Sequence, residues 1–514
     1  MGNIFNSIQI ERPKFNAFDL THDHKLSFNQ GQLVPIMCED VVPGSSHILG
    51  GSCMLRFAAM ISPPMHRFDV TMHYFFVPYR ILWENWEKFI SNDPEGLPAF
   101  PTLTVNDDNY TQLDDHLGIP IPVDNVQSET ISALFHSAYQ KVYNDYYRDQ
   151  NLIPEVDWKL VDGANAAADL RALRYRAWEH DYFTSALPFA QKGAAVDLPL
   201  GDVTLKDNWY DDAPGNPHFQ TQIGNVLSGE VFGNNLTTPP FGNAGPSIGG
   251  SDAGDSFPPY AYDPNGSLIV AATTINDLRR AEKLQEWLEL NARAGTRYTE
   301  FLQAHFNVKP EDARLQRPEY ITGVKNPVVI SEVLNTTGTD DAPQGNMAGH
   351  GISVMSGKLG KYHVKEHGCI IGIMSVLPRT AYMQGINRQF LKTVDPFQYF
   401  FRQFENIGEQ EVLNKEIYAF QGSAGNNTFG YNPRYSEYKY ATSRVSGDFR
   451  NNLMFWHAAR QFDAPPALNA QFVTSDPTSR YFAVTEETVQ KMYCHVLNKW
   501  TAINPMDKYS TPSF

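Results

Sequence analysis

Residues that could carry out chemistry occur at several places in this chain, and the first candidate is a nucleophilic serine. Residues 245–249 match the G-x-S-x-G pattern of serine hydrolases. The serine of that pattern is reactive only on a sharp turn between a strand and a helix. Here it lies in a glycine-rich stretch without helical or alternating periodicity, which favours a chance match.

A phosphate-binding loop is excluded by spacing. The stretch from Gly351 to Lys358 resembles a Walker loop in composition, but it is one residue too long. In addition, Leu359 stands where the loop needs a hydroxyl group to bind magnesium.

Metal ligation is the next candidate, because His363, His367 and Cys369 are close in sequence and could supply zinc ligands. Two histidines four residues apart face one ion only on a helix, whereas the neighbouring residues indicate an extended chain. His22 and His24 could ligate together, but they fit a solvated turn equally well. We therefore expect no catalytic site, no metal and no cofactor.

Nucleic-acid contact is suggested by one stretch in which tyrosines alternate with basic residues, since bases stack on aromatic rings while cations bind phosphates. The candidate DNA-facing residues are Arg434, Tyr435, Lys439, Tyr440 and Arg444. Packing of these tyrosines against a neighbouring strand is the alternative interpretation, and it stays open.

Composition limits the possible partners. The 514 residues are 42% apolar and carry 57 acidic against 41 basic side chains, which gives a net charge of −16. A surface of this average charge repels phosphate, so coating of nucleic acid by this chain alone is excluded. Condensing a genome would need a separate cationic protein.

Targeting and redox signals are absent from the sequence. The nearly unbroken apolar stretch from Cys369 to Leu377 is about half as long as a membrane-spanning helix requires, so we expect no membrane insertion. Neither a secretory signal nor an acylation pattern is present at the start of the chain. The cysteines have no paired spacing, and we expect reduced, buried thiols.

Periodicity predicts both strands and helices. Alternating apolar residues from Asp69 to Pro78 predict a strand that ends at a sheet margin, and residues 368–377 and 494–500 also read as strands. Apolar residues three and four apart predict a helix over residues 134–147. A second helix is expected from Thr274, with Asp277 in a capping box and Gly295 as its stop, and an arginine-rich neighbour ends near Pro310. A further aromatic helix is predicted at 397–404.

A long excursion interrupts this pattern. Residues 201–270 contain 11 glycines, eight prolines and eight acidic side chains against the single base Lys206. A connection of this length within a compact protein is functional or disordered, and its aromatic residues favour partial order. The aromatic residues are Trp209, Tyr210, Phe219, Phe232 and Phe241. We expect residues 1–200 and 267–514 to form one core, with residues 201–266 as a surface insertion.

The fold class follows from these elements. The chain shows no alternation of strands and helices and no repeat period, which excludes doubly wound sheets, TIM barrels and solenoids. A mainly β, two-sheet sandwich with partly helical loop insertions is predicted.

Short sequence motifs occur in a fixed order along the chain, and they are more specific than composition. This chain closely resembles the major capsid proteins of the Microviridae, within them the gokushovirus branch, over about residues 12–475. The motifs are Phe18–His22, Tyr74–Pro78, Leu82–Trp86, Arg148–Asn151, Asp181–Pro188, Gln191–Gly193, Gly295–Tyr298, Ala313–Tyr320, Pro343–Asn346 and Phe429–Tyr431.

The resemblance implies an eight-stranded viral jelly roll, many copies of which close into a T=1 icosahedral shell around circular single-stranded DNA. It also implies that the insertion at 201–266 rises as a threefold protrusion that contacts a host surface receptor. A small basic DNA-packaging protein is implied inside the shell, and the virion would be assembled in the cytoplasm of a bacterial host.

Assembly depends on the binding energy of interfaces between copies, where aromatic residues and arginine are favoured. The candidate intersubunit or framework positions are Trp83, Trp86, Arg314, Arg317 and Tyr320, although core packing explains the two tryptophans equally well. The alternative function is a polysaccharide-binding or polysaccharide-cleaving β-sandwich, since 25 tyrosines and eight tryptophans could stack on sugar rings.

Overall fold

The computed structural model describes residues 14–92, 96–122, 127–194, 196, 203–205, 218–220, 260–262, 268–270, 274–334, 347–486 and 488–509. The chain divides into two compact units. Unit 1 comprises Met1–Lys192 and Glu289–Phe514, and unit 2 comprises Gly193–Leu288, which encloses the expected insertion.

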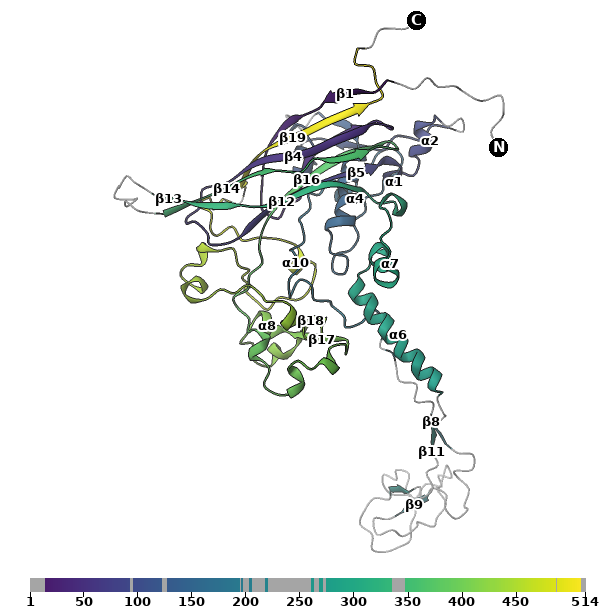
Figure 1. Ribbon diagram of the computed structural model, residues 1–514, viewed down its shortest axis with the longest axis vertical. Helices are drawn as coiled ribbons and strands as arrows, with labels where there is room; N and C mark the ends of the chain where they lie inside the picture. Colours follow the sequence, from purple (N-terminus) through teal and green to yellow (C-terminus); the bar gives the residue numbers. More distant parts are fainter. Residues whose placement is uncertain are drawn as a thin grey trace, which may run out of the picture. The chain divides into compact units, whose positions relative to one another are not determined.

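A seven-stranded antiparallel sheet forms one layer of unit 1 (Figure 1). Its strand order is β1-β19-β4-β14-β13, with β2 also paired to β19 and β15 also paired to β4. The strands are β1 (Asn16–Asp19), β2 (His22–Phe28), β4 (Ser46–Phe57), β13 (Val329–Leu334), β14 (Met347–Ser356), β15 (Gly360–His363) and β19 (Met492–Asn504). The first and last strands of the chain are therefore neighbours in one sheet.

A four-stranded antiparallel sheet in the order β12-β5-β16-β3 forms the second layer. Its strands are β3 (Val34–Val41), β5 (Phe68–Pro78), β12 (Glu319–Pro327) and β16 (Gly368–Pro378). Inward side chains of both sheets join in one apolar core, which includes Leu55 and Val496 from the first sheet and Met72 and Ile370 from the second. The expected mainly β sandwich is thus confirmed.

The predicted strand at Asp69–Pro78 is present as β5, but it is an inner strand and is buried on both faces. Residues such as Val70 and Met72 face the other sheet, whereas Phe75 and Val77 pack in a second apolar cluster with the helical connections. Because β12 and β16 pair with it on either side, the strand does not lie at a sheet margin. The predicted strand at 368–377 is β16, and the one at 494–500 lies within β19.

The sheets approach closely where a glycine faces a tyrosine. A Cβ atom at Gly51 of β4 would lie 2.3 Å from the hydroxyl oxygen of Tyr74 on β5. The Tyr74 hydroxyl donates a hydrogen bond to Asn498 Oδ1 of β19 (2.9 Å). Glycine at position 51 is therefore required for this contact between the layers.

A buried histidine links two strands of the seven-stranded sheet. The indole N–H of Trp500 donates to Nδ1 of His47 (3.0 Å), and Nε2 of His47 lies 2.7 Å from Ser45 Oγ. Because an indole can only donate, Nδ1 must be unprotonated. Burial lowers the pKa of His47 to about 4.

The helix predicted at 134–147 is confirmed, and its last turn is π-helical. It consists of α4 (Leu134–Val142) followed by η1 (Tyr143–Tyr147). The predicted helix after Thr274 is α6 (Ile275–Ala294), with Thr274 Oγ1 donating to Asp277 Oδ2 (2.7 Å). Gly295 ends this helix with a φ of +99°. The helix that follows is α7 (Tyr298–Phe306), which contains no arginine, because Arg293 and Arg297 precede it.

The continuous helix predicted at 397–404 is wrong. Two short 3-10 turns occur instead, η4 (Pro396–Gln398) and η5 (Arg402–Phe404). Asp395 caps the first turn as expected, but Tyr399 is extended and interrupts the helical hydrogen bonds. The remaining helical segments are α1 (Tyr79–Leu82), α2 (Trp86–Ile90), α3 (Gln112–His116), α5 (Ala168–Arg171), η2 (Ala313–Leu315), η3 (Arg388–Phe390), α8 (Asn414–Ile417), η6 (Gly422–Asn426), α9 (Ser436–Lys439), η7 (Gly447–Arg450), η8 (Met454–Trp456) and α10 (Ala470–Val473).

Short two-stranded ladders complete both units. Unit 1 contains β6 (Thr102–Val105) with β7 (Glu129–Ser132), and β17 (Glu409–Leu413) with β18 (Thr428–Pro433). Unit 2 contains β8 (Val203–Leu205) with β11 (Leu268–Val270), and β9 (His218–Gln220) with β10 (Tyr260–Tyr262).

The four cysteines are free thiols, and Cys53, Cys369 and Cys494 are buried, whereas Cys38 is partly exposed. Among the described residues, no helix is long and apolar enough to cross a membrane.

Candidate functional site

The described part of the chain contains no metal site. No group of three or more histidine, cysteine, aspartate or glutamate side chains there could hold an ion. His363 ends β15, and its Nδ1 atom lies 3.0 Å from Ser46 Oγ. Cys369 is buried in β16. The extended conformation expected around these residues is confirmed. His22 and His24 lie on strand β2 rather than on a turn.

Within the described residues, the sequence pattern for a phosphate loop forms no phosphate site. Gly351 to Ser356 belongs to strand β14, so the Walker-like stretch is not a loop before a helix. The G-x-S-x-G pattern at 245–249 lies outside the described residues.

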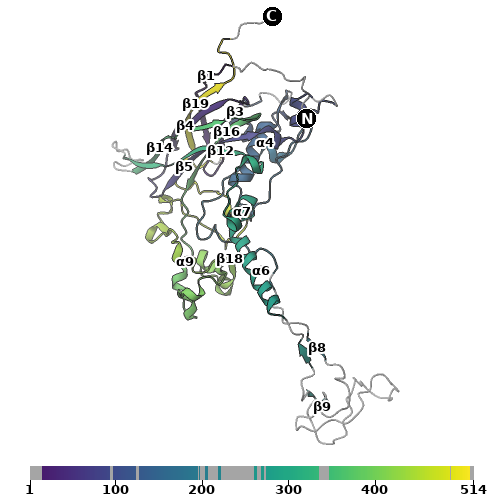
Figure 2. The same ribbon diagram turned by 45° about the vertical axis from the view of Figure 1, so that its right-hand side comes forward.

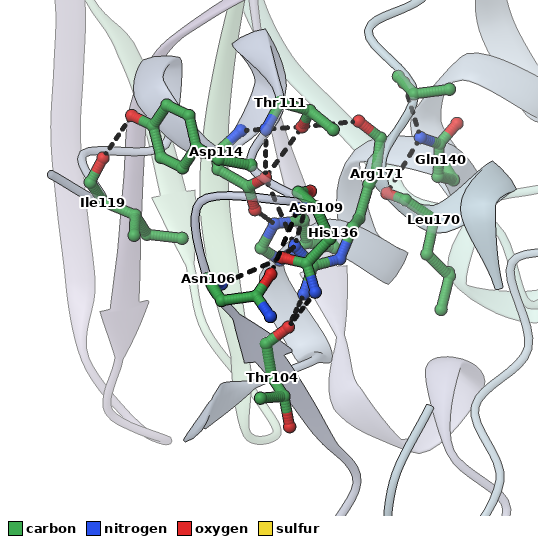
Figure 3. A network of polar contacts seen from close by, with 12 residues as sticks. Thr104, Asn106, Asn109, Thr111, Asp114, Ile119, His136, Gln140, Leu170 and Arg171 are labelled. Atoms are coloured by element: carbon green, nitrogen blue, oxygen red, sulfur yellow. Dashed lines mark hydrogen bonds and ion pairs between the residues drawn. The ribbon is translucent and has the colours of Figure 1, made fainter. Parts of the chain in front are cut away.

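A buried polar network does resemble a catalytic arrangement (Figure 3). Nε2 of His136 on α4 lies 2.8 Å from Oδ1 of Asp114 on α3, and Nη1 of Arg171 lies 3.5 Å from Oδ2 of the same carboxylate. The backbone N–H and hydroxyl of Thr111 each donate to Asp114 Oδ2 (both 2.8 Å). Burial would raise the pKa of Asp114, but the hydrogen bonds from His136 and Thr111 outweigh it and lower that pKa.

This network is structural, because no substrate can reach it. Asp114 is 0% exposed and His136 is 1% exposed. Arg171 also donates to the carbonyl and side-chain oxygens of Asn109 (3.1 and 3.0 Å), which fixes the loop before α3. The group therefore holds α3, α4 and α5 together beside the sandwich.

An open cavity of about 750 Å³ lies among the loops of unit 1. Two carboxylates line it, and a cation neutralises each. Arg388 Nη1 lies 2.8 Å from Glu416 Oε1, and Lys392 Nζ lies 2.7 Å from Glu437 Oε1. Burial raises the pKa of Glu416, and the nearby Arg388 opposes that rise. Other lining residues include Tyr182, Phe183, Tyr382, Tyr418, Phe420, Tyr440, Arg444 and Arg450.

The candidate DNA-facing residues all follow β18 in the chain and lie in different surroundings. Tyr435 is only 1% exposed, so its ring supports the neighbouring chain and is closed to stacking. Arg434 donates to the carbonyl oxygen of Phe397 (2.8 Å), and Lys439 lies 3.7 Å from Glu405. Tyr440 is exposed, and both Tyr440 and Arg444 line the cavity described above.

The candidate intersubunit or framework positions divide by burial. Trp83 is fully buried and donates from Nε1 to Asp162 Oδ1 (2.7 Å), and Trp86 packs in the same apolar cluster. Arg317 lies over the ring of Tyr146 at 4.8 Å. Tyr320 is half-exposed beside Phe75.

Arg314 is exposed in the 3-10 turn before β12. In the insertion, Trp209, Tyr210, Phe232 and Phe241 lie outside the described residues, whereas Phe219 belongs to β9 and pairs with Ala261.

Sequence reasoning missed one surface, the face of the seven-stranded sheet that is turned away from the four-stranded sheet. We call it the outer sheet face. Lys25, Arg56, Lys361 and Lys499 lie on it, one each from β2, β4, β15 and β19. Lys25 and Arg56 lie more than 300 residues before Lys361 and Lys499 in the sequence, and only the strand register brings the two pairs together. The local signal was their alternation with buried apolar residues.

Comparison with known proteins gives consistent results over the whole chain. The capsid protein (F protein) family matches residues 4–514. The capsid protein VP1 of Bdellovibrio phage phiMH2K is 36% identical over 541 residues, covering 99% of this chain and 96% of that protein. The capsid protein VP1 of Chlamydia phage 1 is 32% identical over 588 residues, covering 100% of this chain and 98% of that protein.

A third relative, the capsid protein VP1 of Spiroplasma virus 4, is 30% identical over 557 residues and is covered to 96%. The resemblance to gokushovirus capsid proteins is thereby confirmed. The alternative of a polysaccharide-binding or polysaccharide-cleaving protein finds no support, because the matching family and relatives are capsid proteins. The chain belongs to the capsid protein (F protein) family of bacteriophages.

Proposed function

We propose that this major capsid protein is the repeating subunit of a T=1 icosahedral shell that encloses circular single-stranded DNA. The observation that carries the assembly is a set of exposed aromatic side chains on the loops of unit 1, of which Phe420 is 97% exposed. A soluble monomer rarely leaves so many rings in water, and interfaces between subunits are where such rings become buried. The others are Phe390, Phe397, Tyr399, Phe400, Phe401 and Tyr438.

Electron microscopy of the purified full-length chain tests this proposal. Uniform spherical particles are expected, because identical weak contacts repeated around closed axes add up to a cooperative assembly. A monodisperse monomer under every assembly condition would contradict the proposal.

Eight of the strands support the finer assignment to a jelly roll. Four lie in one sheet in the order β2-β19-β4-β14, and four lie in the other in the order β3-β16-β5-β12. In chain order the strands change sheet at every step except from β5 to β12. This alternation supports the proposal, because the double Greek key of a jelly roll requires it. Strands β1, β13 and β15 then extend the first sheet.

The insertion supports host attachment. Unit 2 is a separate compact unit that interrupts unit 1 between Lys192 and Glu289. An addition of this kind can vary without disturbing the core, as receptor-binding segments must. We propose that its aromatic residues, Trp209, Tyr210, Phe219, Phe232 and Phe241, contact a host surface receptor. Loss of adsorption to host cells by particles that carry alanine at these five positions would support the assignment.

Genome packaging requires a cationic partner, because the chain itself has a net charge of −16. We propose a small basic DNA-packaging protein inside the shell. Of the sequence-derived DNA-facing set, Arg434, Lys439, Tyr440 and Arg444 remain as the proposal, because Tyr435 is buried. Binding of oligo(dT) by the variant R434Q/K439Q/R444Q tests this set.

Contacts between subunits are proposed for the exposed members of the candidate set, Arg314 and Tyr320. Arg317 braces the chain between them, since it donates to Thr299 Oγ1 (3.1 Å) and to the carbonyl oxygen of Asp145 (3.0 Å). Trp83 and Trp86 serve as framework. Substitution of Arg314 or Tyr320 by alanine should reduce particle yield without changing the unfolding temperature of the subunit.

A further inference from the structure

No described helix of unit 1 lies over the outer sheet face (Figures 1 and 2). The loop at Lys358 and Leu359 packs on it at Gly50. Strand register aligns its side chains in rows. One row runs Ser27, Tyr493, Arg56 and Ile352 across β2, β19, β4 and β14. The next row along the strands runs Lys25, His495, Met54 and Val354. Residues paired in this way point to the same side of a sheet.

Four cations on this face have no ionic partner in the described part of the chain. Lys25, Arg56, Lys361 and Lys499 are exposed, and no described carboxylate lies within 4.0 Å of any of them. By contrast, Lys439 in the sequence-derived set already pairs with Glu405. Exposed cations without a carboxylate partner are free to pair with an anion from outside the chain.

The carboxylates on the same face are few. Asp19 and Asp23 belong to it by register, and Asp23 Oδ1 lies 3.3 Å from Nε2 of His495. The face is therefore locally basic although the chain is acidic.

Apolar and aromatic groups lie between the cations. Val354 is 72% exposed and Tyr493 is 44% exposed. Tyr493, Met54, Lys25 and Arg56 line an open hollow of about 460 Å³. An exposed ring beside unpaired cations is the combination that single-stranded nucleic acid recognises, since bases stack on the ring and phosphates pair with the cations.

We propose that the outer sheet face binds the single-stranded DNA genome, with Tyr493 as a stacking platform and Lys25, Arg56, Lys361 and Lys499 as phosphate contacts. This inference rests on the proposed function and deepens it by naming the surface turned toward the genome. Binding of DNA to this face would be independent of base sequence, because neither stacking nor phosphate pairing distinguishes bases.

The attachment points of the insertion support this orientation. Chain re-enters unit 1 at Glu289, and a Cβ atom at Gly408 would lie 3.0 Å from the Glu289 carboxylate. Gly408 precedes β17, which lies on the side of unit 1 opposite β1, β19 and β4 (Figures 1 and 2). A host-attachment site and a DNA-binding surface belong on opposite sides of a shell, and the return point of the insertion and the outer sheet face lie on opposite sides of unit 1 (Figures 1 and 2).

A second copy of the chain is the competing occupant of this face. Burying four unpaired cations against a protein costs desolvation unless a carboxylate meets each one. The DNA backbone offers phosphates at regular intervals instead, so charge complementarity favours DNA.

Three matched variants of the full chain test the proposal, and each removes three positive charges. The outer-face variant is K25Q/R56Q/K499Q, and the loop variant is R434Q/K439Q/R444Q. The control variant is K88Q/K159Q/K309Q, at exposed positions elsewhere. Binding of a fluorescent oligo(dT) strand is measured by anisotropy at several salt concentrations. Each phosphate contact contributes about −0.7 to the slope of log K against log salt for a single strand.

The outer-face variant should lose about 2 from the magnitude of this slope, whereas the other two variants keep the wild-type slope. Y493A should weaken binding at least about fivefold for any base sequence. Equal losses in all three triple variants, or a loss confined to the loop variant, would overturn the proposal.

Particle assembly separates this inference from the proposed function. The outer-face variant should still form shells, and those shells should contain less DNA by their absorbance ratio. An outer-face variant that binds oligo(dT) normally but forms no shells would show a contact between copies and overturn the DNA assignment. Absence of shells for the wild-type chain would refute the proposed shell, while the oligo(dT) result would still decide the surface.

Discussion

The backbone N–H of Arg434 donates a hydrogen bond to the carbonyl oxygen of Gly408 (3.3 Å). Gly408 lies against Glu289, where the chain returns from the insertion, and Arg293 one turn later pairs with Glu409. The stretch that the sequence suggests for DNA contact is thus beside the base of the segment that it suggests for host contact.

Removal of the insertion should leave unit 1 folded. In a chain whose residues 205–262 are replaced by a short glycine-serine linker, the unfolding temperature of unit 1 should change by only a few degrees, because its core lies in the sandwich. Circular dichroism and calorimetry give the comparison. Particles assembled from this deletion variant should fail to adsorb to host cells. Insoluble protein after the deletion would contradict the separation into two units.

Substitution of Gly51 by alanine should destabilise the sandwich by about 1–3 kcal/mol, because the new methyl group would overlap the Tyr74 hydroxyl. The free energy of unfolding in urea provides the measurement. Tyr74→Phe removes the overlapping oxygen, so Gly51→Ala should cost less in that background than in the wild type. Equal costs in both backgrounds would show that the sheets separate at this point.

Acid should weaken the sandwich through His47. Above pH 6.5 this histidine is neutral in both the folded and the unfolded chain. As the pH falls from 6.5 toward 4, the unfolded chain binds a proton that the folded chain excludes, so stability is lost. The loss is on the order of 2–3 kcal/mol for this group.

His47→Gln removes that titration. The difference in unfolding free energy between pH 7 and pH 4.5 should therefore be smaller in His47→Gln than in the wild type, whatever the substitution costs at pH 7. Identical pH dependence of the two proteins would assign the acid sensitivity to other groups.

Asp114→Ala should cost about 3–5 kcal/mol, because it leaves Arg171 without its buried counter-charge and His136 without its hydrogen-bond partner. Asp115→Ala is the matched control, since Asp115 is exposed on the same helix. Urea unfolding of both variants gives the comparison. A similar small cost for the two would show that water satisfies the network after the carboxylate is removed.

Local periodicity predicted those elements whose burial follows a simple repeat. The sequence predicted elements whose signal lies within about fifteen residues. These elements are the apolar face of α4, the caps of α6 at Thr274 and Gly295, and the strands β5 and β16. The predicted helix at 397–404 failed for a physical reason. Its aromatic residues are spaced for a helix, but the rings of Phe397 and Phe404 pack on each other across two separate turns.

The candidate surface depends on long-range pairing that no local pattern contains. Arg56 and Tyr493 are opposite each other on β4 and β19, although more than four hundred residues separate them. The burial of Tyr435 was equally hidden, since a tyrosine in a polar stretch reads as exposed until its neighbours in space are known. The sequence therefore indicated aromatic and basic side chains as the candidate DNA contacts. The strand register then indicated which side chains of these kinds share one surface.

The pairing of β19 with β1, β2 and β4 also has a consequence for synthesis. On the ribosome, β1, β2 and β4 emerge early and must wait for a partner that is translated almost five hundred residues later. A prematurely terminated chain consequently lacks a central strand and exposes two unsatisfied ladders. Such fragments would be recognised by proteases and chaperones before they could join a growing particle, so the order of translation itself acts as a check on subunit integrity.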